Sequence, residues 1–131
     1  MLKIFNGTQH AITIYSIEDT VSVQNGRKLV LKEGAAPILQ LPPGINLNAV
    51  KGNSELPEHL RETEIPLKGG VRFLSYDSIP EGYDIVIVSN LYRSAVKELG
   101  HDTSKLATVN GLVYMSETEM RPCGCTALAV G

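Results

Sequence analysis

Apolar and polar residues alternate over several short stretches of this chain, with the period of two that is typical of half-buried β-strands. Two such stretches open the sequence, residues 2–6 and 10–15, with a turn at Gly7 between them. They predict either a β-hairpin or a pair of adjacent short strands. Asn25-Gly26 separates two further runs, and this dipeptide is the strongest short signal for a hairpin. The strands of that hairpin are then residues 21–23 and 29–31.

The middle of the chain alternates between short strand patterns and residues that break them. Residues 36–41 predict a strand that must end at Pro42-Pro43-Gly44, because proline has no N–H to donate to a sheet. Residues 45–50 predict another short strand, and residues 51–64, with glycine, proline and many charges, predict a loop. Further strands are expected at residues 65–67, 71–76, 106–109, 112–115 and 126–130, with turns at residues 79–82 and 110–111.

The clearest unit is a strand followed directly by a helix. Residues 83–88 (YDIVIV) end in four β-branched residues, the composition of a strand covered on both faces. Ser89 and Asn90 come next, and both are residue types that cap helix N-termini. Leucine and alanine then recur every fourth position up to Gly100, which predicts one main helix over about residues 90–99.

One main helix among many short strands indicates an α+β fold with one or two mixed sheets, and 131 residues indicate a single globular domain over residues 1–131. The net charge is −2 without long runs of either sign, which argues against a nucleic-acid binder. The chain has no apolar stretch long enough to span a bilayer and no signal-peptide pattern at its start, so we expect a cytoplasmic protein without membrane contact.

The best candidate ligand site lies after the buried strand, where Ser89, Asn90, Tyr92 and Arg93 surround the start of the helix. A helix N-terminus presents unpaired N–H groups and a positive dipole, which suit a phosphate or carboxylate. The structural alternative is that Ser89 or Asn90 only caps the helix and Arg93 faces solvent.

A second candidate is the segment at residues 6–10 (NGTQH), where Thr8 and His10 offer hydrogen bonds beside a glycine. The structural alternative is an ordinary turn between two strands, with His10 bonded to the backbone. Together, Thr8, His10, Ser89, Asn90, Tyr92 and Arg93 form the predicted ligand-binding set, without catalytic or metal-binding residues and without a cofactor.

Other reactive residues carry weaker patterns. His101 precedes Asp102, but neighbours in sequence do not point at each other as a catalytic triad requires. Cys123 and Cys125 are half of a four-ligand zinc site, so we expect reduced structural thiols rather than a redox pair or a metal site completed by histidine. None of the common nucleophile, phosphate-loop, dinucleotide or metalloprotease motifs is present.

Four phrases of the chain resemble a family of small phage and prophage proteins of unassigned function. That family opens with Asn-Leu-Thr-Pro-His, has a Leu-Pro-Glu turn before an Ile-Val-Ser strand end and a helix, and closes on Gly-Cys-x-x-Leu-Ala. This chain has Gly7 and Gln9 where the family has leucine and proline, and Asn48-Ala49-Val50 where Ala-Arg-Val is common, so a role for that arginine does not carry over. The phrases are residues 4–14 (IFNGTQHAITI), 79–82 (IPEG), 83–89 (YDIVIVS) and 123–129 (CGCTALA).

The resemblance implies phage origin, and small phage accessory proteins often counter host defence. One such class resembles sponges, which bind a nucleotide signal of the host, such as a cyclic ADP-ribose derivative or a cyclic dinucleotide, without cleaving it. Tight sequestration favours a closed pocket, so we also expect a homo-oligomer, with residues 126–130 as a pairing edge. Two alternatives stay open: a nucleotide hydrolase or phosphodiesterase that uses His10 or His101, and a protein-binding virion module.

Overall fold

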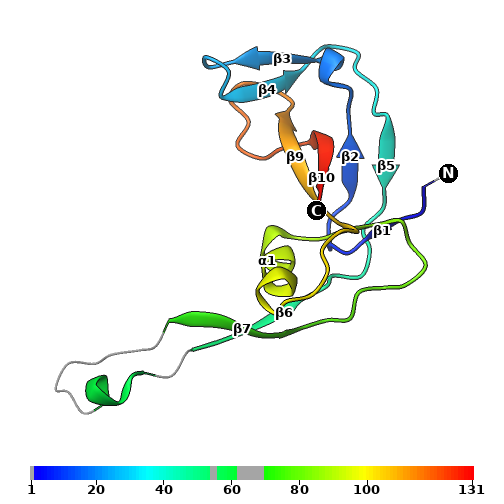
Figure 1. Ribbon diagram of the computed structural model, residues 1–131. Helices are drawn as coiled ribbons and strands as arrows, with labels where there is room; N and C mark the ends of the chain where they lie inside the picture. Colours follow the sequence, from blue (N-terminus) through cyan, green and yellow to red (C-terminus); the bar gives the residue numbers. More distant parts are fainter. Residues whose placement is uncertain (1, 54–55, 62–69) are drawn as a thin grey trace.

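The computed structural model describes residues 2–53, 56–61 and 70–131 and confirms the α+β fold (Figure 1). One helix of nine residues accompanies an eight-stranded mixed sheet and a separate two-stranded ribbon. The elements are β1 (Ile4–Asn6), β2 (Ile12–Ile14), η1 (Ile17–Asp19), β3 (Thr20–Val23), β4 (Lys28–Leu31), β5 (Leu39–Leu41), β6 (Ala49–Asn53), η2 (Glu58–Leu60), β7 (Val71–Tyr76), β8 (Ile85–Ile87), α1 (Asn90–Glu98), β9 (Leu106–Tyr114) and β10 (Gly124–Val130).

Strand β8 lies inside the large sheet, whose order is β1-β8-β9-β10-β2-β5, with the β3–β4 hairpin joined to β9 through β4. Both neighbours of β8 run parallel to it, with Val86 opposite Phe5 on one side and Leu106 on the other. Val86 and Ile87 are completely buried. The prediction of a strand covered on both faces is therefore confirmed, and so is the hairpin around Asn25-Gly26.

The two opening strands do not form the hairpin that was one of the two predictions. Strand β1 pairs with β8, whereas β2 pairs with β10 and β5. Three strands separate β1 from β2 in the sheet, so a flat sheet would place them about 19 Å apart at about 4.8 Å per strand. Residues 7–11 connect them, and the sheet curls so that β2, β8, β9 and β10 contribute side chains to one cavity.

The expected turn at Asn110-Gly111 is wrong, because β9 runs through it as one strand. Asn110 pairs with Ala127 and Leu112 with Cys125, so β10 holds the strand on both sides of the glycine. Gly111 has a positive φ of 65° and bends the strand locally instead of ending it. Within the predicted pairing edge at residues 126–130, residues 127–130 each pair with a residue of β9, and β2 is the neighbour of β10 on its other side.

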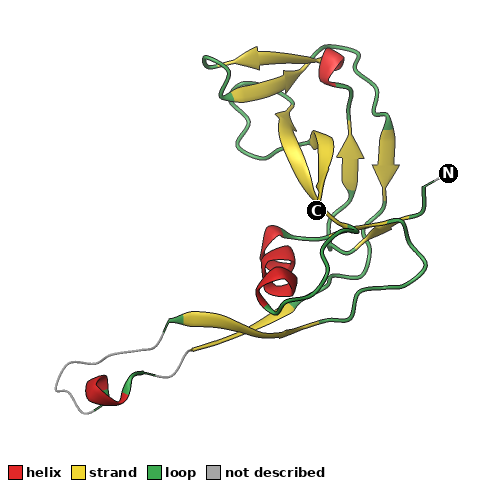
Figure 2. Ribbon diagram, in the orientation of Figure 1, coloured by secondary structure: helices red, strands yellow, loops and turns green. Residues whose placement is uncertain are grey.

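The loop predicted for residues 51–64 is wrong at its start, because β6 continues through Asn53 and pairs with β7. This antiparallel ribbon begins beside α1 and projects away from the large sheet (Figure 2). The short helix η2 also lies in the predicted loop. The strand predicted at residues 65–67 lies outside the described residues.

Helix α1 buries Tyr92, Ala95 and Val96 against the sheet. Tyr92 and Val96 join Val86 and Leu106 in one core cluster. The helix begins at the predicted cap Ser89 and ends in a Schellman motif, in which Gly100 at φ +80° donates to the Lys97 carbonyl and His101 to the Val96 carbonyl. No helix in the described part of the chain is both long and apolar enough to cross a membrane.

Candidate functional site

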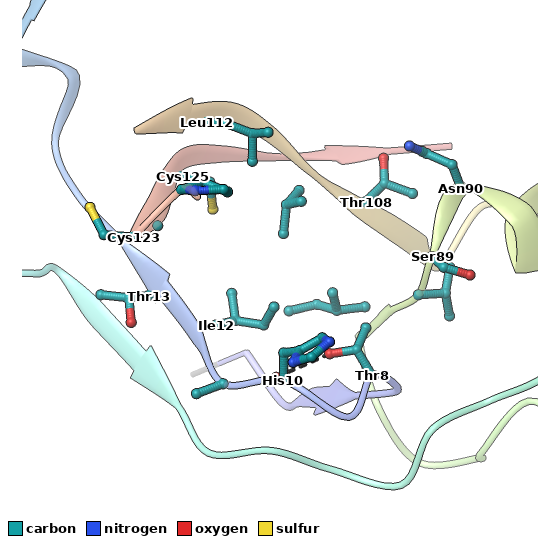
Figure 3. A pocket seen from close by; sticks show the side chains of 16 residues that line it. Thr8, His10, Ile12, Thr13, Ser89, Asn90, Thr108, Leu112, Cys123 and Cys125 are labelled. Atoms are coloured by element: carbon teal, nitrogen blue, oxygen red, sulfur yellow. Dashed lines mark hydrogen bonds between the residues drawn. The ribbon is translucent and has the colours of Figure 1, made fainter. Parts of the chain in front are cut away.

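A cavity of about 520 Å³ opens where three segments meet: the β1–β2 loop, the β8–α1 junction and the facing parts of β9 and β10 (Figure 3). Its volume lies within the usual range of small-molecule pockets, about 300–1,000 Å³. Sixteen residues line it: Thr8, His10, Ala11, Ile12, Thr13, Ile87, Val88, Ser89, Asn90, Thr108, Val109, Leu112, Pro122, Cys123, Gly124 and Cys125.

The β8–α1 junction supplies one end of this cavity. Ser89 has extended backbone angles, and its hydroxyl oxygen accepts a hydrogen bond from the Tyr92 N–H at 3.1 Å. The first N–H groups of a helix have no partner within it, so the amides of Asn90 and Leu91 are available to water or to a ligand. The positive end of the helix dipole therefore lies at the rim of the cavity beside Ser89 and Asn90.

The β1–β2 loop is held in place by the buried side chain of Asn6. Its amide nitrogen donates to the carbonyls of His10 at 2.8 Å and Pro42 at 2.9 Å. Its amide oxygen accepts from the backbone N–H of Thr8 at 3.0 Å and from the Thr8 hydroxyl at 2.6 Å. Asn6 thus fixes two of the three loop residues that line the cavity, and it acts as a positioning residue for Thr8 and His10.

Gly7 ties the same loop to the end of β8. Its N–H donates to the Ile87 carbonyl at 2.7 Å, and its carbonyl accepts from the Leu47 N–H at 3.0 Å. A Cβ at this position would lie 2.7 Å from the Ile87 oxygen and 2.8 Å from Leu47 Cδ1. The close approach requires glycine, and it brings the Thr8–His10 segment next to the β8–α1 junction.

The inner wall of the cavity is apolar. Ile12, Ile87 and Cys125 form a core cluster whose surfaces reach the cavity. Burial raises the pKa of the Cys125 thiol, and burial also raises that of Cys123, whose Sγ donates to the Val113 carbonyl at 3.4 Å. Both cysteines are free, and the protonated thiol is a poor nucleophile.

The structure brings together four of the six predicted site residues. Thr8 and His10 arrive from one segment, and Ser89 and Asn90 arrive from another about eighty positions later. In Figure 3, His10 and Thr8 lie along one wall of the cavity, and Ser89 and Asn90 lie at the end next to the helix. The two segments meet because β1 and β8 are parallel neighbours, so their carboxyl ends lie side by side.

Tyr92 and Arg93 do not line this cavity. Tyr92 is completely buried in the core, where its hydroxyl donates to the Asp77 carbonyl, and burial raises its pKa to about 12. Arg93 donates from Nε to the Gly131 carbonyl. Each helical residue is rotated by about 100° from the one before, so Tyr92 lies on another face of α1 than Asn90, whereas Arg93, almost one turn after Asn90, is held by its bond to the Gly131 carbonyl.

The sequence did not reveal Thr108 as a residue that lines the cavity, and for the two cysteines it favoured structural thiols over a redox pair or a metal site. Thr108 lies within a buried apolar run of β9, where a threonine gives no signal that separates a cavity wall from a packed strand. Cys125 lines the cavity and packs in the core at once. Within the described ranges, no group of three or more His, Cys, Asp or Glu side chains could hold a metal ion.

His101 faces a second, more open cavity of about 590 Å³ and is hydrogen-bonded through Nδ1 to the Tyr76 hydroxyl. Asp102 does not pair with it. The Asp102 carboxylate accepts from the backbone N–H and the hydroxyl of Ser104, both at 2.9 Å, and these bonds lower its pKa. The two neighbours therefore do not form an acid–base pair, and they lie apart from the residues of the first cavity.

The first cavity is weakly charged. His10 has the only basic side chain among the described residues that line it, and no lysine, arginine, aspartate or glutamate does so. The other polar residues of the lining are Thr8, Thr13, Ser89, Asn90 and Thr108, and the Thr13 oxygen points away from the cavity (Figure 3). A site of this kind binds by hydrogen bonds and apolar contact, with the helix N-terminus as its main source of positive potential.

No model of a known protein family, no curated protein and no solved structure matches this chain.

Proposed function

We propose that this protein binds one small nucleotide-like molecule with a low negative charge and holds it without turning it over. The observation that carries the proposal is the meeting of Thr8, His10, Ser89 and Asn90 at one cavity beside a helix N-terminus. A phosphate at the rim would accept hydrogen bonds from the helix amides and from the Ser89 hydroxyl. From the wall that carries His10 and Thr8, His10 would hydrogen-bond the ligand, and Thr8, whose hydroxyl donates to Asn6, would accept from it (Figure 3).

The apolar wall supports a ring system as the other part of the ligand. Ile12, Ile87 and Cys125 offer a surface for a heterocyclic ring, and Asn90 offers hydrogen-bonding groups for a sugar or base. Pockets for small molecules commonly combine such an apolar lining with a few polar groups that fix the orientation of the ligand.

The low charge of the residues that line the cavity limits the negative charge of the ligand that it can bind. A single anion near a helix N-terminus gains about 0.3–1 kcal/mol from the dipole, and more where it is partly buried. A polyphosphate would lack the lysine and arginine partners that such groups usually meet. The cavity therefore favours a molecule with one or two phosphate groups over a nucleoside triphosphate.

Turnover has less support than binding. The thiols that reach the cavity have raised pKa values, and no carboxylate among the described lining residues could orient His10 as a general base. The hydrolase alternative therefore rests on His10 alone, because His101 lies at the other cavity.

The resemblance to small phage proteins gives this binding a role. We propose that the protein is phage-encoded, acts in the host cytoplasm and sequesters a nucleotide signal of the cyclic ADP-ribose or cyclic dinucleotide type, which would inhibit host defence. A homo-oligomer remains part of the proposal, since a second copy could close the exposed side of the cavity at Ser89 and Asn90.

Calorimetric titration with cyclic ADP-ribose, a cyclic dinucleotide and AMP tests the proposal. We expect at least one to bind, and we expect the bound molecule to be recovered intact after the protein is denatured. The substitutions His10→Ala and Asn90→Ala should weaken binding about tenfold or more, the loss of one or two ligand hydrogen bonds. His59→Ala and Ser94→Ala, at exposed positions outside the cavity, are the matched controls. Cleaved product would support the hydrolase, and no binding by any of the three would contradict the proposal.

A further inference from the structure

Thr108 is a buried polar residue in the wall of the cavity. Its side chain is only 6% exposed, and it lines the same cavity as Ser89 and Asn90 (Figure 3). Its hydroxyl forms no hydrogen bond with the other residues that the structure describes, and its oxygen keeps some contact with solvent. The hydroxyl therefore has no protein partner in the described part of the chain, and in Figure 3 its oxygen points toward the Asn90 end of the cavity.

A buried hydroxyl without a partner is uncommon, because polar groups that leave water are normally hydrogen-bonded within the fold. The neighbours of Thr108 in β9 are Ala107 and Val109, and β10 places Ala129 opposite, so no side chain next to it in the sheet can serve. Water, or a ligand group that displaces it from the cavity, is the partner left to this hydroxyl.

We propose that Thr108 determines which ring the cavity accepts, by hydrogen-bonding one exocyclic carbonyl or amino group of a heterocyclic base. This inference rests on the proposed function and adds the orientation of the ligand. The ring enters first and lies between Thr108 and the wall formed by Ile12 and Ile87, and the anionic group stays at the exposed rim by Ser89 and Asn90.

The opposite orientation is disfavoured by desolvation. Ser89 and Asn90 are exposed, whereas Thr108 is buried among apolar residues. Burying a charged group costs far more than burying a neutral one that keeps its hydrogen bond. The neutral end of the ligand therefore goes inside, where a single hydroxyl can discriminate between rings that differ by one polar substituent.

Titration of three purine nucleotides tests this orientation: AMP with an exocyclic amino group, IMP with an exocyclic carbonyl, and purine riboside 5′-monophosphate with neither. The wild-type protein should bind AMP or IMP about tenfold more tightly than the unsubstituted nucleotide, the difference expected for one hydrogen bond in a buried site. Thr108→Val, which keeps the shape, should abolish that preference, and affinity for the unsubstituted nucleotide should change less than twofold.

Thr108→Ser retains a hydroxyl and should retain the preference, and Thr118→Val on an exposed loop is the matched control. If Thr108→Val does not fold, the wild-type and serine proteins alone carry the comparison. Equal binding of all three nucleotides by the wild type, or an unchanged preference in the valine variant, overturns the inference while the proposed function survives. Failure of every nucleotide to bind overturns both.

Discussion

The amide oxygen of Asn6 accepts two hydrogen bonds from Thr8, one from its backbone N–H at 3.0 Å and one from its hydroxyl at 2.6 Å. The amide nitrogen of the same side chain donates to the carbonyl of His10 at 2.8 Å. One buried side chain thus sets the loop that forms one wall of the cavity. The hydroxyl of Thr8 is already engaged with Asn6, which leaves its oxygen lone pairs and its methyl group for a ligand.

We expect the substitution Asn6→Asp to destabilise the protein by about 3 kcal/mol, because the carboxylate would face the His10 and Pro42 carbonyls without a proton to donate. Urea denaturation measures the change. Asn25→Asp, at the exposed tip of the β3–β4 hairpin, is the matched control and should leave stability within about 0.5 kcal/mol. Equal stability of the two variants would contradict the role given to Asn6.

Gly7→Ala should destabilise the protein by about 2–4 kcal/mol, because the new methyl group would contact the Ile87 carbonyl and Leu47 at less than van der Waals distance. Gly70→Ala is the control, since a Cβ there meets no atom within 4 Å and its φ is ordinary. Thermal unfolding of the two variants gives the comparison. A Gly7→Ala protein as stable as the Gly70→Ala protein would mean that the loop does not approach β8 so closely.

The pH dependence of stability provides a test of Tyr92. Burial raises its pKa from the ordinary tyrosine value of 10.0 to about 12, so the folded state holds the phenol proton more tightly than the unfolded state does. The stability that this proton provides is complete below pH 10 and is lost as the pH rises towards 12. Tyr92→Phe lacks this proton and should lose less stability over that interval than the wild type.

Urea denaturation at pH 8, 10 and 11 measures this difference, and the comparison between the two proteins removes the contribution of the other tyrosines and the lysines. Tyr92→Phe should also cost about 1 kcal/mol at pH 8, because the Asp77 carbonyl loses its donor. Parallel curves for the two proteins from pH 8 to 11 would be inconsistent with a buried, hydrogen-bonded phenol.

The strand-to-helix unit was predictable because its signals are local. Four β-branched residues in succession require cover on both faces, and Ser89 supplies the cap that begins the helix. The direction of each side chain was not predictable to the same degree. Ser89 and Asn90 line the cavity, but Tyr92 turns into the core and Arg93 is held by the Gly131 carbonyl.

The features of the fold that local sequence patterns did not predict depend on pairing between strands that lie far apart in the chain. Asn110-Gly111 is a strong turn signal, yet β10 pairs with both sides of it and keeps β9 continuous. Thr108 lines the cavity because β8, β9, β10 and β2 contribute residues to it together, and no local pattern encodes that arrangement. The meeting of the β1–β2 loop with the β8–α1 junction likewise depends on β1 pairing with β8.

The different burial of the two cysteines predicts how fast a thiol reagent modifies each of them. Cys125 is 1% exposed with a raised pKa, so a thiol reagent such as iodoacetamide should modify Cys123 first at pH 7.5 and leave Cys125 largely unmodified. Mass spectrometry of peptides after timed labelling reads both positions. A bound nucleotide should slow the reaction further at either cysteine, and preferential labelling of Cys125 would contradict its burial in the cavity wall.

The most direct test of the shared site is a nuclear magnetic resonance titration of the ¹⁵N-labelled protein with AMP. The amides of Thr8, His10, Ser89 and Asn90 should shift together along one saturation curve, and that of His101, at the second cavity, should stay in place. Shifts confined to His101 and its neighbours, or saturation of the two segments at different AMP concentrations, would contradict a single binding site formed by the β1–β2 loop and the β8–α1 junction.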